Sequence, residues 1–129
     1  MQYREVRLDD IWRATHGNTP VPSEVFKLRS WECLCDSQQV GHCEGQCDTG
    51  EIIGLSVSRS HRRQGIGRKL LSLVVGSLRA AGVERVWVAA SADSTVHDHR
   101  FYRAVGWEPT GQCVNGDDEV FEPRTDGWH

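Results

Sequence analysis

The sequence predicts a single α/β domain in which a central mixed β-sheet carries helices on its faces. Two segments carry this prediction. Gly65–Ala81 places apolar residues three and four positions apart, which is the period of a helix with one buried face. Arg85–Ala90 is almost wholly apolar, as in a strand buried on both faces. With 129 residues, the chain has room for one domain over 1–129, and 123–129 is expected to be an irregular tail.

The other elements follow from changes of period and from Gly, Pro and Asp residues at their ends. In chain order they are a strand at Tyr3–Arg7, a helix that Asp9 or Asp10 caps and that ends at His16, a loop at Asn18–Ser23, a hairpin of strands Leu28–Cys35 and Val40–Cys47, a strand at Glu51–Val57, a helix at Thr95–Val105, and strands at Trp107–Gln112 and Glu119–Phe121. Because strands alternate with helices, a sheet of mixed direction is expected.

Composition excludes several classes of protein. The chain is 38% hydrophobic and 26% charged, which is typical of a folded domain and not of a disordered one. It holds no apolar run of the roughly 18 residues that span a membrane, so no membrane partner is expected. The first residues lack the apolar stretch of a signal peptide, and a cytoplasmic location is therefore expected.

Positive charge is concentrated in one segment. Between Arg59 and Lys69 there are five Arg and Lys residues and no carboxylate. The remainder of the chain carries 10 positive and 18 negative charges, a net of −8. A short cationic segment in an acidic chain indicates a local anion site and argues against a nucleic-acid-binding surface.

The segment Leu55–Arg68, with the sequence LSVSRSHRRQGIGR, is typical of a phosphate-binding loop. A strand leads into a basic loop, and a helix begins at Gly65 and Gly67. A helix start offers unpaired N–H groups, and glycine allows the backbone to approach an anion closely. The third glycine of the dinucleotide-binding pattern is replaced by Leu70, and no Gly-Lys-Ser/Thr triplet is present, so neither of those two classes of loop fits.

Arg62-Arg63-Gln64-Gly65-Ile66-Gly67 resembles the acyl-CoA loop of the GNAT acetyltransferase superfamily, Arg/Gln-x-x-Gly-x-Gly/Ala. Its context is similar as well. Leu55 and Val57 have the Leu-x-Val spacing of the family's preceding strand, and Phe101–Trp107 resembles its Phe-Tyr-x-x-x-Gly-Phe run. The resemblance extends from Trp31 to Trp107. It implies a GNAT-type domain with two parallel strands that splay apart at the cofactor cleft.

The resemblance implies acetyl-CoA as co-substrate and no metal. The residues implied to contact it are Leu55, Ser56 and Val57 along the pantetheine arm, Arg62, Arg63, Gln64, Gly65, Ile66, Gly67 and Arg68 around the pyrophosphate, and Thr95 in place of a frequent asparagine. Thr95 is the weakest of these because threonine has a shorter reach than asparagine.

Two catalytic residues are implied. Tyr102 occupies the position of the acid that protonates the leaving thiolate, and the alternative is a packing role beside Phe101. Glu51 resembles the glutamate base of histone-type members, and the alternative is an exposed carboxylate at a strand end. A regular strand would place Glu51 on the face of Ile53, Leu55 and Val57, where apolar neighbours would raise its pKa. Glu44, Asp48 and His42 are the reserve bases.

The function expected from these observations is direct transfer of an acetyl group from acetyl-CoA to a primary amine in a ternary complex. Because the chain is acidic outside the loop, a cationic acceptor is expected: an aminoglycoside, a polyamine or a protein amine. The candidate acceptor residues are Glu32, Glu44, Asp48, Asp117, Asp118 and Glu119. The segment between the first two predicted strands is short, so a homodimer remains an alternative to a monomer. The alternatives are a CoA-binding regulatory module without turnover and, less favoured, a nucleic-acid binder.

Four cysteines and His42 cluster in the predicted hairpin. With Ser37 and Gln38 at its tip, Cys33 lies opposite His42, and Cys43 and Cys47 point to the other face. Ligands on two faces cannot converge on one ion, and the spacing is not that of a zinc ribbon. We therefore expect buried thiols and no metal site.

Overall fold

The computed structural model describes residues 1–90 and 99–124. Within these ranges the elements are β1 (Gln2–Val6), α1 (Leu8–His16), α2 (Ser23–Phe26), β2 (Leu28–Cys35), β3 (Gln38–Gln46), β4 (Ile52–Val57), the 3₁₀ turn η1 (Arg59–His61), α3 (Ile66–Ala80), β5 (Val88–Ala90), α4 (His99–Ala104), β6 (Trp107–Val114) and β7 (Asp118–Pro123). The sequence did not predict α2. The predicted start of α4 at Thr95 lies outside the described residues.

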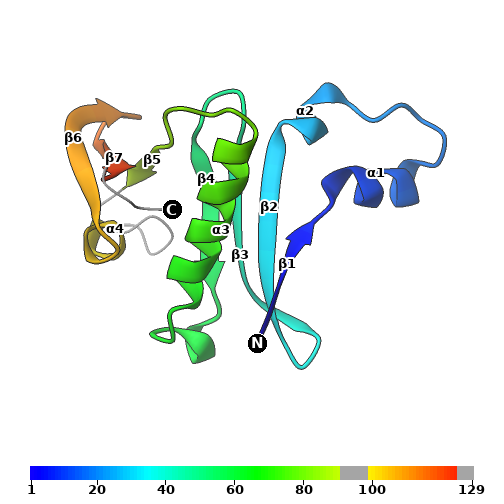
Figure 1. Ribbon diagram of the computed structural model, residues 1–129, viewed down its shortest axis with the longest axis horizontal. Helices are drawn as coiled ribbons and strands as arrows, with labels where there is room; N and C mark the ends of the chain where they lie inside the picture. Colours follow the sequence, from blue (N-terminus) through cyan, green and yellow to red (C-terminus); the bar gives the residue numbers. More distant parts are fainter. Residues whose placement is uncertain (91–98, 125–129) are drawn as a thin grey trace.

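The strands form two antiparallel groups that meet at one point (Figure 1). Neighbouring strands pair in the order β1-β2-β3-β4 in one group and β5-β7-β6 in the other. A parallel bridge between Glu51 and Trp87 joins the groups, with Ile52 N–H donating to the Trp87 carbonyl at 2.8 Å. The mixed α/β architecture expected from the sequence is therefore confirmed, and among the described residues β4 and β5 are not paired beyond this bridge.

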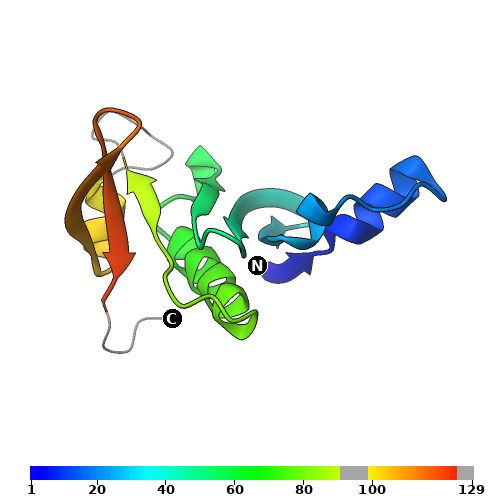
Figure 2. The same ribbon diagram turned by 90° about the horizontal axis from the view of Figure 1, so that it is seen from above.

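Helix α3 is the centre of the core. It packs on β2, β3 and β4, and both views show it beside the region where the two strand groups meet (Figures 1 and 2). Its buried side chains recur at helical spacing: Ile66, Leu70, Leu71, Val74, Val75 and Leu78. The predicted helix Gly65–Ala81 is confirmed to within one residue at each end.

The strand predicted at Arg85–Ala90 is too long. The structure has a strand only at Val88–Ala90, where it pairs with β7. Trp87 instead crosses to the start of β4, because its N–H and carbonyl are bonded to Gly50 and Ile52. Arg85 is exposed and pairs with Glu122. The apolar composition of residues 85–90 does not show that Trp87 bonds to the start of β4 instead of to β7.

Helices α1 and α2 lie on the β1 side of the first strand group in both ribbon views (Figures 1 and 2). Neither helix contains a buried residue. The predicted Asp cap of α1 is wrong: Arg7 stands at the cap position, and the Asp9 carboxylate accepts a hydrogen bond from Arg13 one turn later, at 2.9 Å. The predicted end at His16, followed by Gly17, is confirmed. In the described parts of the chain, no helix is long and apolar enough to cross a membrane.

Candidate active site

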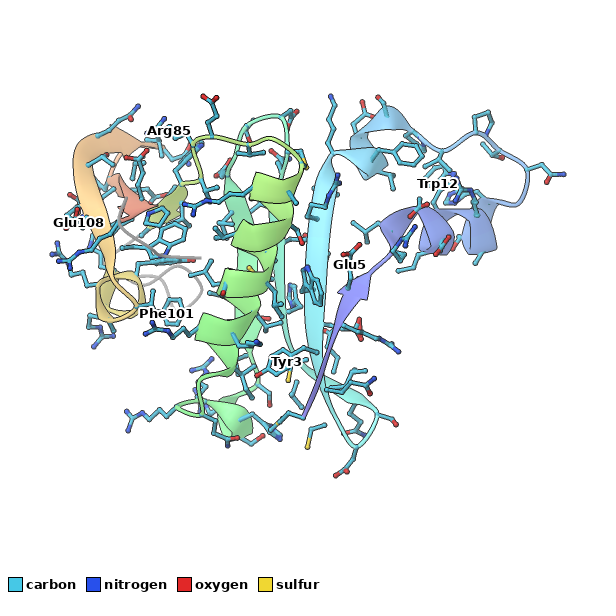
Figure 3. The ribbon with its side chains drawn as sticks, in the orientation of Figure 1. Tyr3, Glu5, Trp12, Arg85, Phe101 and Glu108 are labelled. Atoms are coloured by element: carbon cyan, nitrogen blue, oxygen red, sulfur yellow. The ribbon has the colours of Figure 1, made fainter. Side chains whose placement is uncertain are left out.

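A cleft of about 720 Å³ lies where β4 runs into the basic loop and α3 begins. Helix α4 forms its other wall, and Phe101 projects from that helix toward α3 (Figure 3). The volume is typical of sites for small molecules. The lining residues are Leu55, Ser56, Val57, His61, Arg62, Arg63, Gly65, Ile66, Gly67, Arg68, Arg100, Phe101, Ala104 and Val105.

The start of α3 opens into this cleft. Gly65 precedes the helix with a φ of 81°, a left-handed conformation that glycine adopts without steric cost. No side chain of residues 1–90 or 99–124 caps the helix, and its first intrahelical bond runs from Lys69 N–H to the Gly65 carbonyl at 3.0 Å. The N–H groups of residues 66–68 therefore have no intrahelical acceptor and can bind an anion.

Arginines surround the open helix end. Arg62, Arg63 and Arg68 all line the cleft and are exposed. Arg62 also holds the loop in place, because its Nε donates to the Val57 carbonyl at 3.2 Å. Arg63 has a φ of 63°, which is strained for a residue with a side chain and is common at functional turns. Charge and open N–H groups thus converge on one end of the cleft.

Nine of the eleven residues implied to contact acetyl-CoA line this cleft. Gln64 is exposed and is not among the lining residues, and Thr95 lies outside the described residues. Five lining residues were not predicted: His61, Arg100, Phe101, Ala104 and Val105. The signal for Arg100 and Ala104 was helical spacing, since they lie four positions apart on α4.

The described residues fit an acyl-CoA. A pyrophosphate matches the arginines and the open start of α3. At Gly67, a Cβ would lie 3.3 Å from Phe101 Cε1 and 3.6 Å from Val57 Cγ2, so a larger residue would narrow the cleft. Beyond the Glu51–Trp87 bridge no strand of the described chain pairs with β4 on its β5 side, which leaves room for an extended arm.

Tyr102 is fully buried in the core. Its ring meets Phe101 edge-on at 5.1 Å between centroids, and it also contacts Trp107 and Phe121. Burial, and then the proximity of Cys43, raises the pKa of the Tyr102 phenol above its ordinary value. The phenol therefore keeps its proton at neutral pH, as a proton donor must, and the same side chain packs the core.

Glu51 lies on a different face from the one predicted. Ile52 and Leu55 are both buried on the α3 side, although a regular strand would place residues three apart on opposite faces. The register of β3 on β4 skips Ile53, which is the extra residue of a β-bulge. Glu51 and Ser56 therefore share the face turned away from α3. As predicted, burial raises the pKa of Glu51.

The six acidic candidates for acceptor binding do not gather at one place. Glu32 and Glu44 belong to β2 and β3, and Glu32 is paired with Arg4 at 3.2 Å. Asp48 follows β3 and lies 3.7 Å from Lys27. Asp117, Asp118 and Glu119 belong to the β6–β7 hairpin. Only Glu32 and Glu44 share the face of Ser56, which lines the cleft.

The predicted register of the cysteine hairpin is wrong. Cys33 lies opposite Gly41, and Glu32 lies opposite His42, because the turn is Asp36–Ser37 and a bulge follows Cys33. Cys43 lies opposite Trp31, so Cys33 and Cys43 share the face that packs on α3. Both thiols are buried, and burial raises the pKa of Cys43. Across the described ranges, no group of three or more His, Cys, Asp or Glu side chains is placed to hold a metal ion.

Solved structures of N-acetyltransferases have the same fold. A putative acyl-CoA N-acyltransferase from Klebsiella pneumoniae superposes with a TM-score of 0.68 over 95% of each chain at 14% identity. The PaiA N-acetyltransferase of Thermoplasma acidophilum, in complex with coenzyme A, gives 0.68 over 96% of this chain and 99% of that one at 13% identity. An aminoglycoside 6′-N-acetyltransferase complexed with coenzyme A gives 0.64 over 98% and 100% at 17% identity.

Comparison of sequences is more specific than comparison of folds. The chain is 35% identical over 80 residues to the chloroplastic GCN5-related N-acetyltransferase 6 of Arabidopsis thaliana. The match covers 60% of this chain and 27% of that protein, so this chain spans about a quarter of the length of its curated relative. The family model of the acetyltransferase (GNAT) family matches residues 11–107, which include the basic loop, α3 and the aromatic run of α4. The chain therefore belongs to the GNAT acetyltransferase family.

Proposed function

We propose that the protein transfers the acetyl group of acetyl-CoA to a cationic primary amine, without a covalent enzyme intermediate. The observation that carries the proposal is the cleft at the end of β4, where an uncapped helix start and three arginines meet the open side of a strand. Family membership and the coenzyme A complexes of structural neighbours support it.

When bound, acetyl-CoA would supply an acetyl group activated as a thioester. The residues of the basic loop and the start of α3 would hold its pyrophosphate. The backbone of Leu55–Val57 would orient the arm and donate an N–H to the thioester oxygen as negative charge develops there. Tyr102 would donate its proton to the departing sulfur. Glu51 would take a proton from the acceptor side through water.

The acceptor class follows from charge. The face of β2 and β3 turned away from α3 carries Glu32 and Glu44, and the chain outside the basic segment has a net charge of −8. Such a surface attracts an amine that is still protonated. Several structural neighbours act on aminoglycosides by name, so an aminoglycoside or polyamine is the first acceptor class to try, before protein amines.

A CoA-binding regulatory module is the second candidate. It is favoured by the complete burial of Tyr102, which packs in the core even without an acid role. Both functions require acetyl-CoA to bind, and only the first requires turnover.

Titration calorimetry with acetyl-CoA is the first test. We expect micromolar binding by the wild type and its loss in Arg63→Ala/Gly65→Glu, because that double variant removes a cation and adds an anion at the start of α3. Arg7→Ala is the matched control, since it removes one exposed arginine at the far end of β1. If the folded wild type does not bind acetyl-CoA, the proposal is wrong.

A further inference from the structure

A row of four side chains crosses the face of the sheet that is turned away from α3. Arg4 lies opposite Glu32, Glu32 opposite His42, and His42 opposite Ser56. Directly opposed residues of antiparallel strands point to the same face. The neighbouring positions Trp31 and Cys43 face α3, where Trp31 Nε1 donates to Ser77 Oγ, so the row lies on the other face. We call these four residues the outer row.

Direct contacts hold both ends of the outer row. The Arg4 guanidinium lies 3.2 Å from the Glu32 carboxylate. At the other end, Ser56 Oγ lies 3.0 Å from His42 Nδ1. Ser56 also lines the cleft described above, so the row ends at the site proposed for the thioester.

The second nitrogen of His42 lies beside Gly54. A Cβ placed at Gly54 would lie 3.9 Å from His42 Nε2, and apart from Gly54 and its two chain neighbours no other atom of the described residues lies within 4 Å of that Cβ. Gly54 is opposite Glu44 and two positions from Ser56 on β4. The absence of a side chain at Gly54 therefore leaves a gap beside Nε2, next to the cleft.

This arrangement suits proton transfer. A serine hydroxyl can accept the Nδ1–H bond, which leaves the lone pair of the neutral ring on Nε2. The charged groups that face His42 are Glu32 from β2, Glu44 from its own strand, and Arg4 from β1 behind Glu32. From β4 it is faced by Gly54 and Ser56, which carry no charge. The Glu44 carboxylate would draw an ammonium group toward Nε2, whereas the charge of Glu32 is balanced by Arg4.

We propose that His42 accepts the proton of the acceptor amine through Nε2, and that Ser56 is the positioning residue that fixes its ring. This proposal rests on the proposed function. The ammonium group has three protons, and the amide product keeps one. The first passes to His42 and then, through water and Glu51, to solvent. The second leaves the nitrogen as the carbon–nitrogen bond forms and the carbon–sulfur bond breaks, and it passes through water to the Tyr102 phenolate, which has given its own proton to sulfur.

The activity test compares His42→Gln and Ser56→Ala with wild type, using spermidine and kanamycin A as acceptors between about pH 6 and 9. We expect His42→Gln to lower kcat about 100-fold and to flatten the acidic limb of its pH profile, with an unchanged Kd for acetyl-CoA. Ser56→Ala should lower kcat about tenfold while keeping that limb, because the base remains but is less well oriented. His16→Gln on α1 is the matched control and should behave as wild type.

A second measurement does not depend on turnover. Nitrogen-15 NMR of the histidine rings reports which nitrogen carries the proton. We expect neutral His42 to be protonated on Nδ1, and Ser56→Ala to weaken that preference. Neutral His42 protonated on Nε2 would overturn the proposal, even in a protein for which no acceptor has been found.

Two activity results would also overturn it. One is a His42→Gln variant that keeps the wild-type pH profile while Glu51→Gln loses most of its kcat. That result would leave the proposed function intact. The other is an acetyl group on Ser56 after incubation with acetyl-CoA alone, detected by mass spectrometry, because His42 would then activate a serine nucleophile. A wild type that does not bind acetyl-CoA would instead refute the proposed function.

Discussion

The two ends of β4 are built for different tasks. At its start, Gly50 and Ile52 are bonded to Trp87 through backbone groups at 3.0 and 2.8 Å, and the Trp87 indole N–H donates to the Thr49 carbonyl at 3.0 Å. At its end, Ser56 and Val57 border a cleft. The start is closed by direct contact between the two strand groups, whereas the end is open beside a helix whose first N–H groups have no intrahelical partner.

The difference separates residues that determine stability from residues that determine binding. At the closed start, Gly50 has a φ of 77°, and a Cβ there would lie only 1.9 Å from the Arg85 carbonyl oxygen. At the open end, Gly65 has a similar φ of 81° but nothing within 4 Å of an added Cβ. Two glycines with nearly the same backbone angle thus tolerate substitution very differently, and the predictions below test that contrast.

Gly50→Ala should have the largest effect. The new Cβ would overlap the Arg85 backbone and force a left-handed residue to carry a side chain, so we expect a loss of about 3 kcal/mol or more in the free energy of unfolding. Urea unfolding, monitored by tryptophan fluorescence, measures this free energy. Gly76→Ala is the matched control, because Gly76 is an exposed helical glycine with open space around it. That variant should be more stable by up to about 1 kcal/mol. Equal stabilities for the two variants would contradict the closed contact at Gly50.

Tyr102→Phe should lower kcat about 100-fold while acetyl-CoA still binds, because the ring packing is kept and the proton donor is lost. Steady-state kinetics and calorimetry on the same preparation separate the two quantities. Tyr3→Phe on β1, which is not among the lining residues of the cleft, is the control. Wild-type turnover in Tyr102→Phe would leave Tyr102 with a packing role alone.

Gly67→Ala should have a moderate effect on acetyl-CoA binding at the open end of β4. The added methyl group would press on Phe101 and Val57, and we expect the Kd for acetyl-CoA to rise about threefold. The same substitution removes a glycine from the first turn of α3, which should raise the free energy of unfolding slightly. Weaker binding in a more stable protein would sharpen the contrast between the two ends. Tighter binding would show that the cleft does not need the space at Gly67.

Glu51→Gln should have the smallest effect on stability, with a defined sign. Burial raises the pKa of Glu51 in the folded state, so folding disfavours the charged carboxylate. The folded protein therefore binds more protons than the unfolded chain, and stability falls as pH rises from about 4.3 through the folded-state pKa. Glu51→Gln should remove this loss of stability with rising pH. Thermal unfolding over a pH series should show a flatter curve and equal or higher stability at neutral pH. A steeper decline in the variant would contradict a raised pKa of Glu51.

The open end was predictable because its signals are local. The glycine pair, the arginines and the apolar period of α3 all lie within one stretch of chain, and each has a direct physical meaning. The same holds for the hairpin strands and for the end of α1 at Gly17. Nine implied cofactor residues consequently line one cleft.

The features that were missed depend on pairings between distant residues. The bulge at Ile53 moved Glu51 to the other face of the sheet, and the register between Cys33 and Gly41 moved His42 away from the cysteines. A shift of one residue reverses the face of every following side chain, and no local pattern in the sequence shows it. The outer row could not be foreseen for the same reason, since its four members come from four strands.

Within the described residues, one side of β4 is unpaired beyond the Glu51–Trp87 bridge, and this bears on how the purified protein behaves in storage. An unpaired strand side presents a line of backbone donors and acceptors that can pair with a strand of another molecule. Arg62 covers one of these groups, the Val57 carbonyl, from within the chain. A ligand lying along β4 would cover the others. Ligand-free protein should therefore aggregate faster than protein kept with coenzyme A, and light scattering during prolonged incubation would show the difference.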